Sequence, residues 1–293
     1  TELNMPERPR AKELNNALTF LQKKHIYPIF FVDEFSFIKV MMDNSVVSPA
    51  FLHTLRQFSF EAKAGFIYAG TYDVDALLED PKYGIQGQLV GCKKEQISEI
   101  DKDSAEELIQ VLGEKLVFTK EAVEHIHRLS GDVPYFVQMI CKYCGFYAVE
   151  NKRSIIGYPE LEYVVKILTG EISPSENSLV KTLPDNVFQN NMFSPADPKE
   201  ENIFITSIVH FNRENKEHPR GVSMVELQEL WASKRVSAFT AKLADSIELL
   251  TKKRVLKDAL DEDLPVYTIT VDLFRRWWSI HHPDITVEIG TIM

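Results

Sequence analysis

The 293-residue chain has little glycine, few cysteines and no long apolar run. Its 12 glycines are about 4% of the residues, whereas typical proteins contain roughly 7% glycine. This low share argues against glycine-rich folds. Three cysteines exclude a disulfide-based scaffold and fit a reducing, cytoplasmic compartment. No stretch reaches the roughly 18 consecutive apolar residues of a membrane span, so we expect no membrane partner.

A basic surplus is also lacking. The chain carries 43 acidic and 33 basic residues, a formal net charge of −10. A field of that sign gives no general attraction to nucleic acid, so any DNA contact must come from a local patch. The hydrophobic share of 44% and the charged share of 26% are those of an ordinary globular protein. The length suggests two or three domains.

Residues 1–92 predict part of an α/β core. Two short apolar runs, 26–32 and 64–71, read as strands, and two amphipathic stretches, 13–24 and 49–60, read as helices. Strand, helix and strand in this order form a βαβ unit. Because the runs show no polar alternation, we expect strands of a parallel sheet buried on both faces.

Residues 93–170 predict an all-helical module. Its expected helices cover 103–113, 119–130, 134–151 and 158–169. Residues 171–202 hold four prolines in irregular polar sequence and read mainly as a linker, in which Phe188 and Phe193 could pack against a neighbour.

Residues 203–293 predict a winged-helix domain. Helices are expected over 201–212, 223–232 and 236–250, followed by strands over 255–257 and 266–270. A closing helix carries Trp277 and Trp278, which we expect to pack in the core rather than to stack on bases.

Asp33 and Glu34 are the most informative pair, because two carboxylates stand where an apolar strand ends. Ligands of open parallel sheets bind at that end of the strands. There Asp33 could hold Mg²⁺ through water and Glu34 could orient an attacking water. The alternative is a polar strand end that caps a helix. The second strand ends in Ala69-Gly70-Thr71, where Thr71 could contact a γ-phosphate or only close a tight turn.

Four segments, in this order, resemble the AAA+ and STAND class of P-loop ATPases. Residues 31–34 look like a Walker B motif and residues 66–71 like a sensor 1 strand. Residues 129–138 are similar to the glycine-x-proline element of the STAND lid. Residues 267–278 resemble the end of the winged helix in archaeal-type and bacterial STAND ATPases. The resemblance covers about residues 14–280.

One family motif is missing. No Gly-Lys dipeptide occurs in the chain, so the Walker A loop that cradles phosphates has no counterpart. Either the chain is the C-terminal part of a longer ATPase, or the core has lost its first third and serves as a scaffold. We expect ATP and Mg²⁺ to bind, and ATP to be hydrolysed, only where the missing loop is present.

The resemblance implies roles for single residues. Asp33 would organise Mg²⁺, Glu34 would orient water and Thr71 would sense the γ-phosphate. Gly131 and Pro134 would line the nucleotide. The nucleotide state would be relayed by rotation of the lid and winged helix to an effector or an assembly, as in a molecular switch.

Two bases could contact a phosphate, although a surface position is the alternative for both. They are Arg56, on the helix before the second strand, and Arg128, in the lid.

Two other function classes stay open. One is a DNA-binding module similar to origin-initiator proteins, which share the lid and winged helix. Residues 203–281 contain 12 bases and 11 acids, with one basic cluster at 252–254 and an acidic hairpin at 258–264. An acidic hairpin is repelled by phosphates, which favours packing on a protein partner or self-assembly over DNA. The other class is a catalytically inert interaction scaffold.

Two further pairs predict structure rather than chemistry. Cys141 and Cys144 lie within one predicted helix without a second cysteine pair, so we expect buried thiols and no zinc site. His125 and His127 lack metal-ligand partners at the usual spacing, and we expect both side chains to be solvated.

Overall fold

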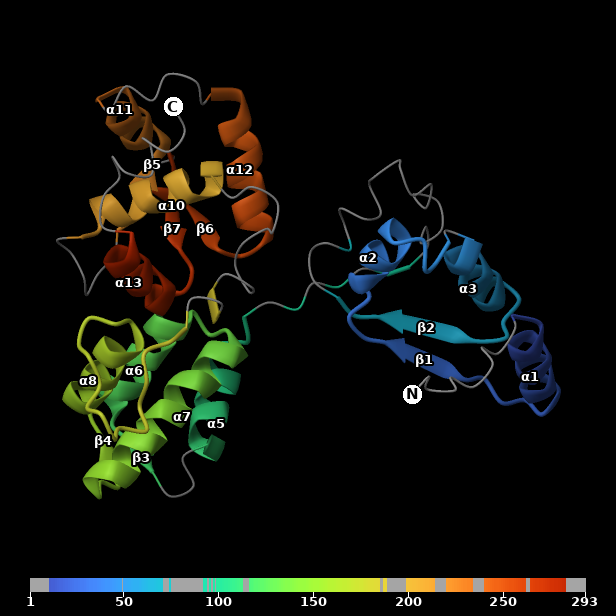
Figure 1. The fold of residues 1–293 in the computed structure, drawn as a ribbon, viewed down its shortest axis with the longest axis horizontal. Coiled ribbons are helices and arrows are strands. Elements are labelled where there is room, and N and C mark those ends of the chain that lie inside the picture. Colours follow the sequence, from blue (N-terminus) through green and yellow to red (C-terminus); the bar gives the residue numbers. More distant parts are fainter. Residues whose placement is uncertain are drawn as a thin grey trace, which may run out of the picture. The chain divides into compact units, whose positions relative to one another are not determined.

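The computed structural model describes residues 11–48, 50–70, 74, 92–93, 95, 97, 99–112, 116–184, 187–188, 199–213, 220–233, 240–261 and 264–282. The chain forms two compact units, Thr1–Glu95 and Gln96–Met293 (Figure 1). The boundaries predicted at residues 170 and 202 fall inside the second unit and stay predictions.

The first unit contains the predicted βαβ arrangement. Its elements are α1 (Ala11–Lys23), β1 (Ile29–Val32), α2 (Phe37–Asp43), α3 (Ala50–Phe60) and β2 (Gly65–Tyr68). The two strands pair in parallel, with Phe30 opposite Phe66 and Val32 opposite Tyr68. Helix α2 was not predicted, because its seven residues span only two turns and are too few to show a clear helical repeat.

Helices α1, α2 and α3 pack on one face of the strand pair. Phe66 and Tyr68 contact buried side chains of α2 and α3, and Phe66 also contacts the cluster of Leu18 and Phe58. Figure 1 shows α2 and α3 along the same side of β1 and β2.

The opposite face of the strand pair is exposed, so the prediction of strands buried on both faces was wrong. Successive side chains of a strand point to opposite faces, which turns Ile29, Phe31 and Ile67 away from the helices. Phe31 is 76% exposed, and Ile29 and Ile67 are about half exposed. The apolar run correctly indicated a strand, but no described helix covers its second face.

The second unit begins with helices α5 (Lys102–Leu112), α6 (Lys120–Ser130), α7 (Pro134–Asn151) and α8 (Tyr158–Leu168), which we call the helical layer. These helices lie close to the predicted positions. Thr119 caps α6 by accepting a hydrogen bond from the backbone N–H of Ala122. The layer is not purely helical, because β3 (Val117–Phe118) and β4 (Ile155–Ile156) form a short parallel pair. Two-residue strands leave too little sequence pattern to predict.

The remaining elements form what we call the C-terminal module. They are α10 (Lys199–Phe211), β5 (Val222–Ser223), α11 (Met224–Ser233), α12 (Thr240–Lys252), β6 (Leu256–Asp261), β7 (Leu264–Ile269) and α13 (Asp272–His281). The three strands form an antiparallel sheet in the order β5–β7–β6. The hairpin β6–β7 and the three preceding helices lie in the predicted order.

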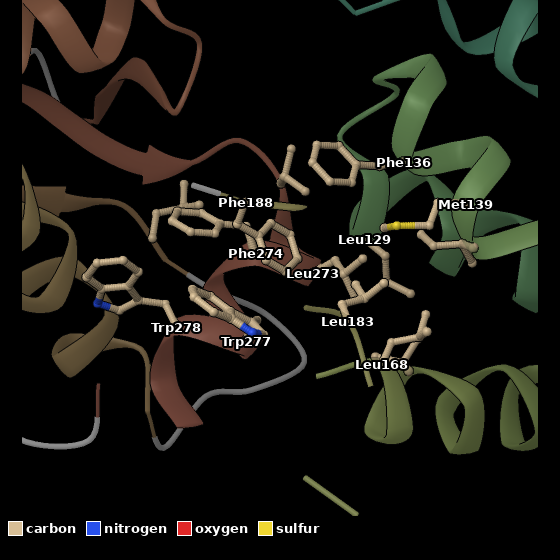
Figure 2. Close-up of a cluster of buried hydrophobic side chains, with 14 of the residues drawn as sticks. Leu129, Phe136, Met139, Leu168, Leu183, Phe188, Leu273, Phe274, Trp277 and Trp278 are labelled. Atoms are coloured by element: carbon tan, nitrogen blue, oxygen red, sulfur yellow. The ribbon is translucent and has the colours of Figure 1, made fainter. Parts of the chain in front are cut away.

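One continuous hydrophobic core joins the helical layer to the C-terminal module. Figure 2 shows Leu129, Phe136 and Leu168 of the layer facing Leu273, Phe274 and Trp277 of α13, with Phe188 among them. Trp277 and Trp278 are buried, as predicted. Phe188 is buried too, which confirms its predicted packing, whereas Phe193 lies outside the described residues.

Within the described part of the chain, no helix has both the length and the apolar character needed to cross a membrane.

Candidate functional site

The loop after β1 places Asp33 and Glu34 at the carboxyl end of the strand pair. Both side chains are exposed. Asp33 Oδ1 accepts a hydrogen bond of 2.8 Å from the backbone N–H of Glu34. The backbone N–H of Phe35 donates to the carbonyl of Ala69, 2.7 Å away. The structure therefore brings the two carboxylates to the edge where β2 also ends.

Glu34 has a left-handed backbone, with φ of 51°. That region is uncommon for residues other than glycine and costs on the order of 1 kcal/mol. Such outliers often occur at functional sites, which is consistent with a role for this residue.

Gly70 allows the two strand ends to approach closely. A Cβ at this position would lie 2.7 Å from Val74 Cγ2 and 3.1 Å from the backbone nitrogen of Ser36. The small residue noted in the sequence is thus required for packing. Thr71 lies outside the described residues, so its role as a phosphate sensor stays a prediction.

The first unit offers few groups that could hold a nucleotide. Carboxylate oxygens such as those of Asp33 suit Mg²⁺. The described residues contain no group of three or more His, Cys, Asp or Glu side chains placed to hold a metal ion. Arg56 is exposed on α3 and makes no side-chain hydrogen bond or ion pair with the described residues. The sequence also has no Walker A motif, so Asp33 offers a carboxylate of the kind that Mg²⁺ prefers, but the first unit shows neither a complete metal site nor a cradle for the phosphates of ATP.

Gly131 and Pro134 lie at the junction between α6 and α7. Gly131 ends α6 with φ of 57°, and its backbone N–H donates to the carbonyl of His127. Pro134 is the first residue of α7, where its missing N–H costs no helical hydrogen bond. A Cβ on Gly131 would lie 2.4 Å from the carbonyl oxygen of Thr270. The glycine therefore permits contact with the C-terminal module, and its nucleotide role stays a prediction.

An open cleft of about 680 Å³ adjoins this junction. It is lined by residues of the helical layer and of the β6–β7 region: Lys102, Glu121, Glu124, His127, Arg128, Gly131, Asp132, Tyr158, Lys257 and Thr270. The lining includes similar numbers of acidic and basic side chains. Its charge therefore favours neither an anionic nor a cationic ligand.

His125 and His127 are buried, so the prediction that they are solvated was wrong. Their side chains are 1% and 8% exposed. His125 Nε2 lies 3.1 Å from Glu162, and His127 Nδ1 lies 2.5 Å from Asp132. The carboxylate of Glu162 comes from α8, 37 positions after His125, so local spacing could not show that pair.

Arg128 fixes the orientation of His125. Its Nη2 lies 2.9 Å from His125 Nδ1. Because a guanidinium can only donate, Nδ1 accepts, and Nε2–H donates to Glu162. Arg128 is exposed, as the surface alternative predicted, yet it contributes to a buried contact.

Glu162 also binds Arg276 of α13. The Nη1 atom of Arg276 lies 2.8 Å from both carboxylate oxygens of Glu162. Arg276 Nε also donates to Asp272, and Arg275 pairs with the same carboxylate. Burial alone would raise the pKa of Glu162, but hydrogen bonds from His125 and the nearby Arg276 outweigh it and lower the pKa to about 2. We refer to Glu162, Arg276, Asp272, Arg275 and His125 as the charged network.

The sequence did contain a signal for this network. The helix at 272–278 is rich in large apolar residues and is therefore expected to be buried, yet it also contains three charged residues, Asp272, Arg275 and Arg276. Buried charges need partners, which predicts an acid on a neighbouring element. Which acid that is, Glu162, could not be read from the sequence.

Each base of the cluster at 252–254 lies near an acidic side chain. Lys253 is only 1% exposed and lies 3.0 Å from Glu201. Lys252 pairs with Glu248, and Arg254 lies 3.9 Å from Glu99. Lys253 is therefore no part of a surface patch, whereas Lys252 and Arg254 are exposed beside their acidic partners.

Cys141 and Cys144 are buried in α7, as predicted. Burial raises the pKa of Cys141 to about 12 and also raises that of Cys144. Both thiols therefore stay protonated and unreactive at neutral pH.

No protein-family model and no curated protein matches the chain. Among solved structures, the chain is similar to the Aeropyrum pernix ORC2 protein, solved as ADPNP-ADP complexes, with a TM-score of 0.54 and 13% sequence identity. The similarity covers 99% of this chain and 73% of the ORC2 chain. At this identity the likeness concerns the fold alone, which is helix-rich and mixed α/β. The resemblance to AAA+ and STAND ATPases seen in the sequence stays a prediction.

Proposed function

We propose that this chain is part of an initiator-like AAA+ protein and that its C-terminal module is a winged helix that binds duplex DNA. The observation that carries this proposal is the similarity to ORC2. It extends over 99% of the chain and so includes the C-terminal module. This favours the initiator alternative over the STAND switch.

The order of elements in the C-terminal module supports this proposal. Helix α10, strand β5, helices α11 and α12 and the hairpin β6–β7 follow the winged-helix order. In such domains the helix before the hairpin enters the major groove, which here is α12.

We place the bases that contact DNA near the start of α12, because Lys253, just after its end, is buried in an ion pair with Glu201 and Lys252 is already paired with Glu248 on the surface. Lys234, Arg235 and Lys242 are the basic residues in that part of the sequence. Their side chains lie outside the described residues, so their contact with phosphate is a proposal.

Fluorescence anisotropy with a labelled duplex of about 30 base pairs tests the proposal. Between about 50 and 200 mM salt, the logarithm of the affinity should fall linearly with that of the salt concentration. The double variant Lys234→Ala/Arg235→Ala should bind more weakly and show a shallower slope, whereas Lys252→Ala should match the wild type. Absence of binding at 50 mM salt would refute the proposal.

An ATP-dependent switch is the second candidate, favoured by the two carboxylates at the strand end and by the ADPNP-ADP complexes of ORC2. Together with a Walker A loop, Asp33 would hold Mg²⁺, Glu34 would orient water and Thr71 would donate to the γ-phosphate. Gly131, Pro134 and Arg56 would line the nucleotide. Bound Mg-ATP would supply the phosphoryl group that is transferred to water.

Calorimetric titration with Mg-ATP tests whether the missing loop is needed. The 293-residue chain should show no micromolar binding, and micromolar binding would contradict that expectation. In a form that carries a Walker A loop, Glu34→Gln should keep ATP binding and abolish turnover. Unchanged turnover would remove Glu34 from its role with water.

A further inference from the structure

Residues 178–183, between the helical layer and the C-terminal module, are packed against the layer. Glu150 of α7 accepts hydrogen bonds from the Ser178 hydroxyl and the Leu179 backbone N–H. The backbone N–H of Leu183 donates to the carbonyl of Leu168 at the end of α8. Residues 178–183 are therefore held against the layer and do not act as a free tether.

Phe188 connects both parts through its aromatic contacts. Its ring centroid lies 5.9 Å from that of Phe136 on α7. On the other side it lies 5.4 Å from Phe274 and 5.0 Å from Trp277, both on α13. A rotation of α13 against the layer would break these contacts in a closely packed core.

The charged network crosses the same boundary. Glu162 belongs to α8, and Arg276 belongs to α13. The side chain of Arg276 is 10% exposed, so separating the pair would leave a largely buried charge without its main partner. Such a pair is specific in geometry and resists sliding of one helix on the other.

Gly131 adds a backbone contact. Its Cα approaches the carbonyl of Thr270 so closely that a Cβ there would lie 2.4 Å away. Thr270 is in turn held by a hydrogen bond from its backbone N–H to the carbonyl of Val255. The end of α6 therefore rests directly on the strand ends of the C-terminal module.

We propose that the helical layer and the C-terminal module form one rigid body, locked by the charged network and the Phe188 contacts. This inference differs from the sequence-based expectation that a lid and a winged helix rotate to relay a signal. It does not depend on DNA or nucleotide binding, so it can fail or hold independently of the proposed function.

Distances between nitroxide labels, measured by pulsed electron paramagnetic resonance, test the rigid body. Labels at Val149→Cys on α7 and Val225→Cys on α11 span the two parts, and both positions are exposed. The exposed Cys92 is first replaced by serine. A control pair, Val149→Cys with Val117→Cys, lies within the helical layer and reports the spread caused by the labels alone.

The spanning pair should give a single distance distribution about as narrow as the control pair. A distribution with several maxima, or one clearly broader than the control, would overturn the rigid body. In the Arg276→Met variant the spanning distribution should broaden while the control stays narrow.

If the spanning distribution stays narrow in Arg276→Met, the charged network does not hold the two parts together. The wild-type measurement needs no destabilising change, so the proposal can be tested even if Arg276→Met folds poorly.

Discussion

Arg276 and Glu162 form an ion pair across 114 positions of the chain, in which one guanidinium nitrogen lies 2.8 Å from each carboxylate oxygen. The same carboxylate accepts a hydrogen bond from His125. One side chain of α8 thus connects α6 and α13. The consequences for stability can be measured with single substitutions.

Glu162→Gln should destabilise the second unit by about 3 kcal/mol, since among the described residues it leaves the mostly buried Arg276 with Asp272 as its one charged partner. Urea unfolding followed by circular dichroism measures the change. Lys252→Gln, which removes an exposed pair with Glu248, is the control and should cost less than about 0.5 kcal/mol. Equal losses of unfolding free energy in the two variants would show that the Glu162–Arg276 pair contributes no more to stability than an exposed pair.

The pair should also make stability depend on pH in the acid range. The pKa of Glu162 is about 2 in the folded protein, below its ordinary value of 4.5. The unfolded chain therefore binds the proton more readily, and stability falls as the pH drops from 4.5 through about 2. Subtracting the pH profile of Glu162→Gln from that of the wild type isolates this contribution. A difference that stays constant over this range would contradict the prediction.

Gly131→Ala should destabilise the protein by at least about 2 kcal/mol. The residue has a positive φ, and its added Cβ would collide with the carbonyl of Thr270. Gly145→Ala is the matched control, because it lies inside α7 with no atom within 4 Å of an added Cβ. It should stabilise by about 0.5–1 kcal/mol. Thermal unfolding should therefore show a lower melting temperature for Gly131→Ala and a higher one for Gly145→Ala than for the wild type.

Glu34→Gly should stabilise the first unit by about 1 kcal/mol, because glycine adopts the left-handed backbone at φ of 51° without strain. Glu34→Ala removes the carboxylate but keeps the Cβ, so it should bring no such gain. Chemical denaturation distinguishes the two variants. Equal stability of both would mean that the backbone at this position is not strained.

Lys253→Gln should lower stability without changing the salt dependence of DNA binding. Its ammonium group is buried beside Glu201 and cannot reach a phosphate. The unfolding free energy should fall by about 3 kcal/mol. Anisotropy at a temperature where the variant remains folded should give the wild-type slope. If the slope of log affinity against log salt concentration were reduced by about one unit, Lys253 would be a phosphate contact, which would contradict its burial.

Much of the fold could be predicted from local patterns. The runs that became β1 and β2 are apolar and end in polar or small residues, so both strands and their parallel pairing followed from the sequence. The helices of the second unit showed apolar repeats and clear ends, such as Gly131 after α6. Helix α2 and the two-residue strands β3 and β4 carry too short a pattern to be identified.

The candidate site was only partly predictable, because its contacts join distant parts of the chain. Asp33 and Glu34 were found since they follow a strand directly. The burial of His125 depends on Glu162, which lies on another helix. The burial of Lys253 depends on Glu201, 52 positions earlier. Sequence spacing shows which charges are neighbours on one helix but not which ones meet after folding.

The exposed face of β1 and β2 has a practical consequence for fluorescence experiments. Ile29, Phe31 and Ile67 present apolar side chains to solvent in the folded protein. Dyes such as anilinonaphthalene sulfonate bind surfaces of this kind and are usually taken to report loosened packing. For this protein we expect the native state itself to give a bright dye signal at neutral pH, and substitution of Phe31 by a polar residue should dim it without any loss of structure.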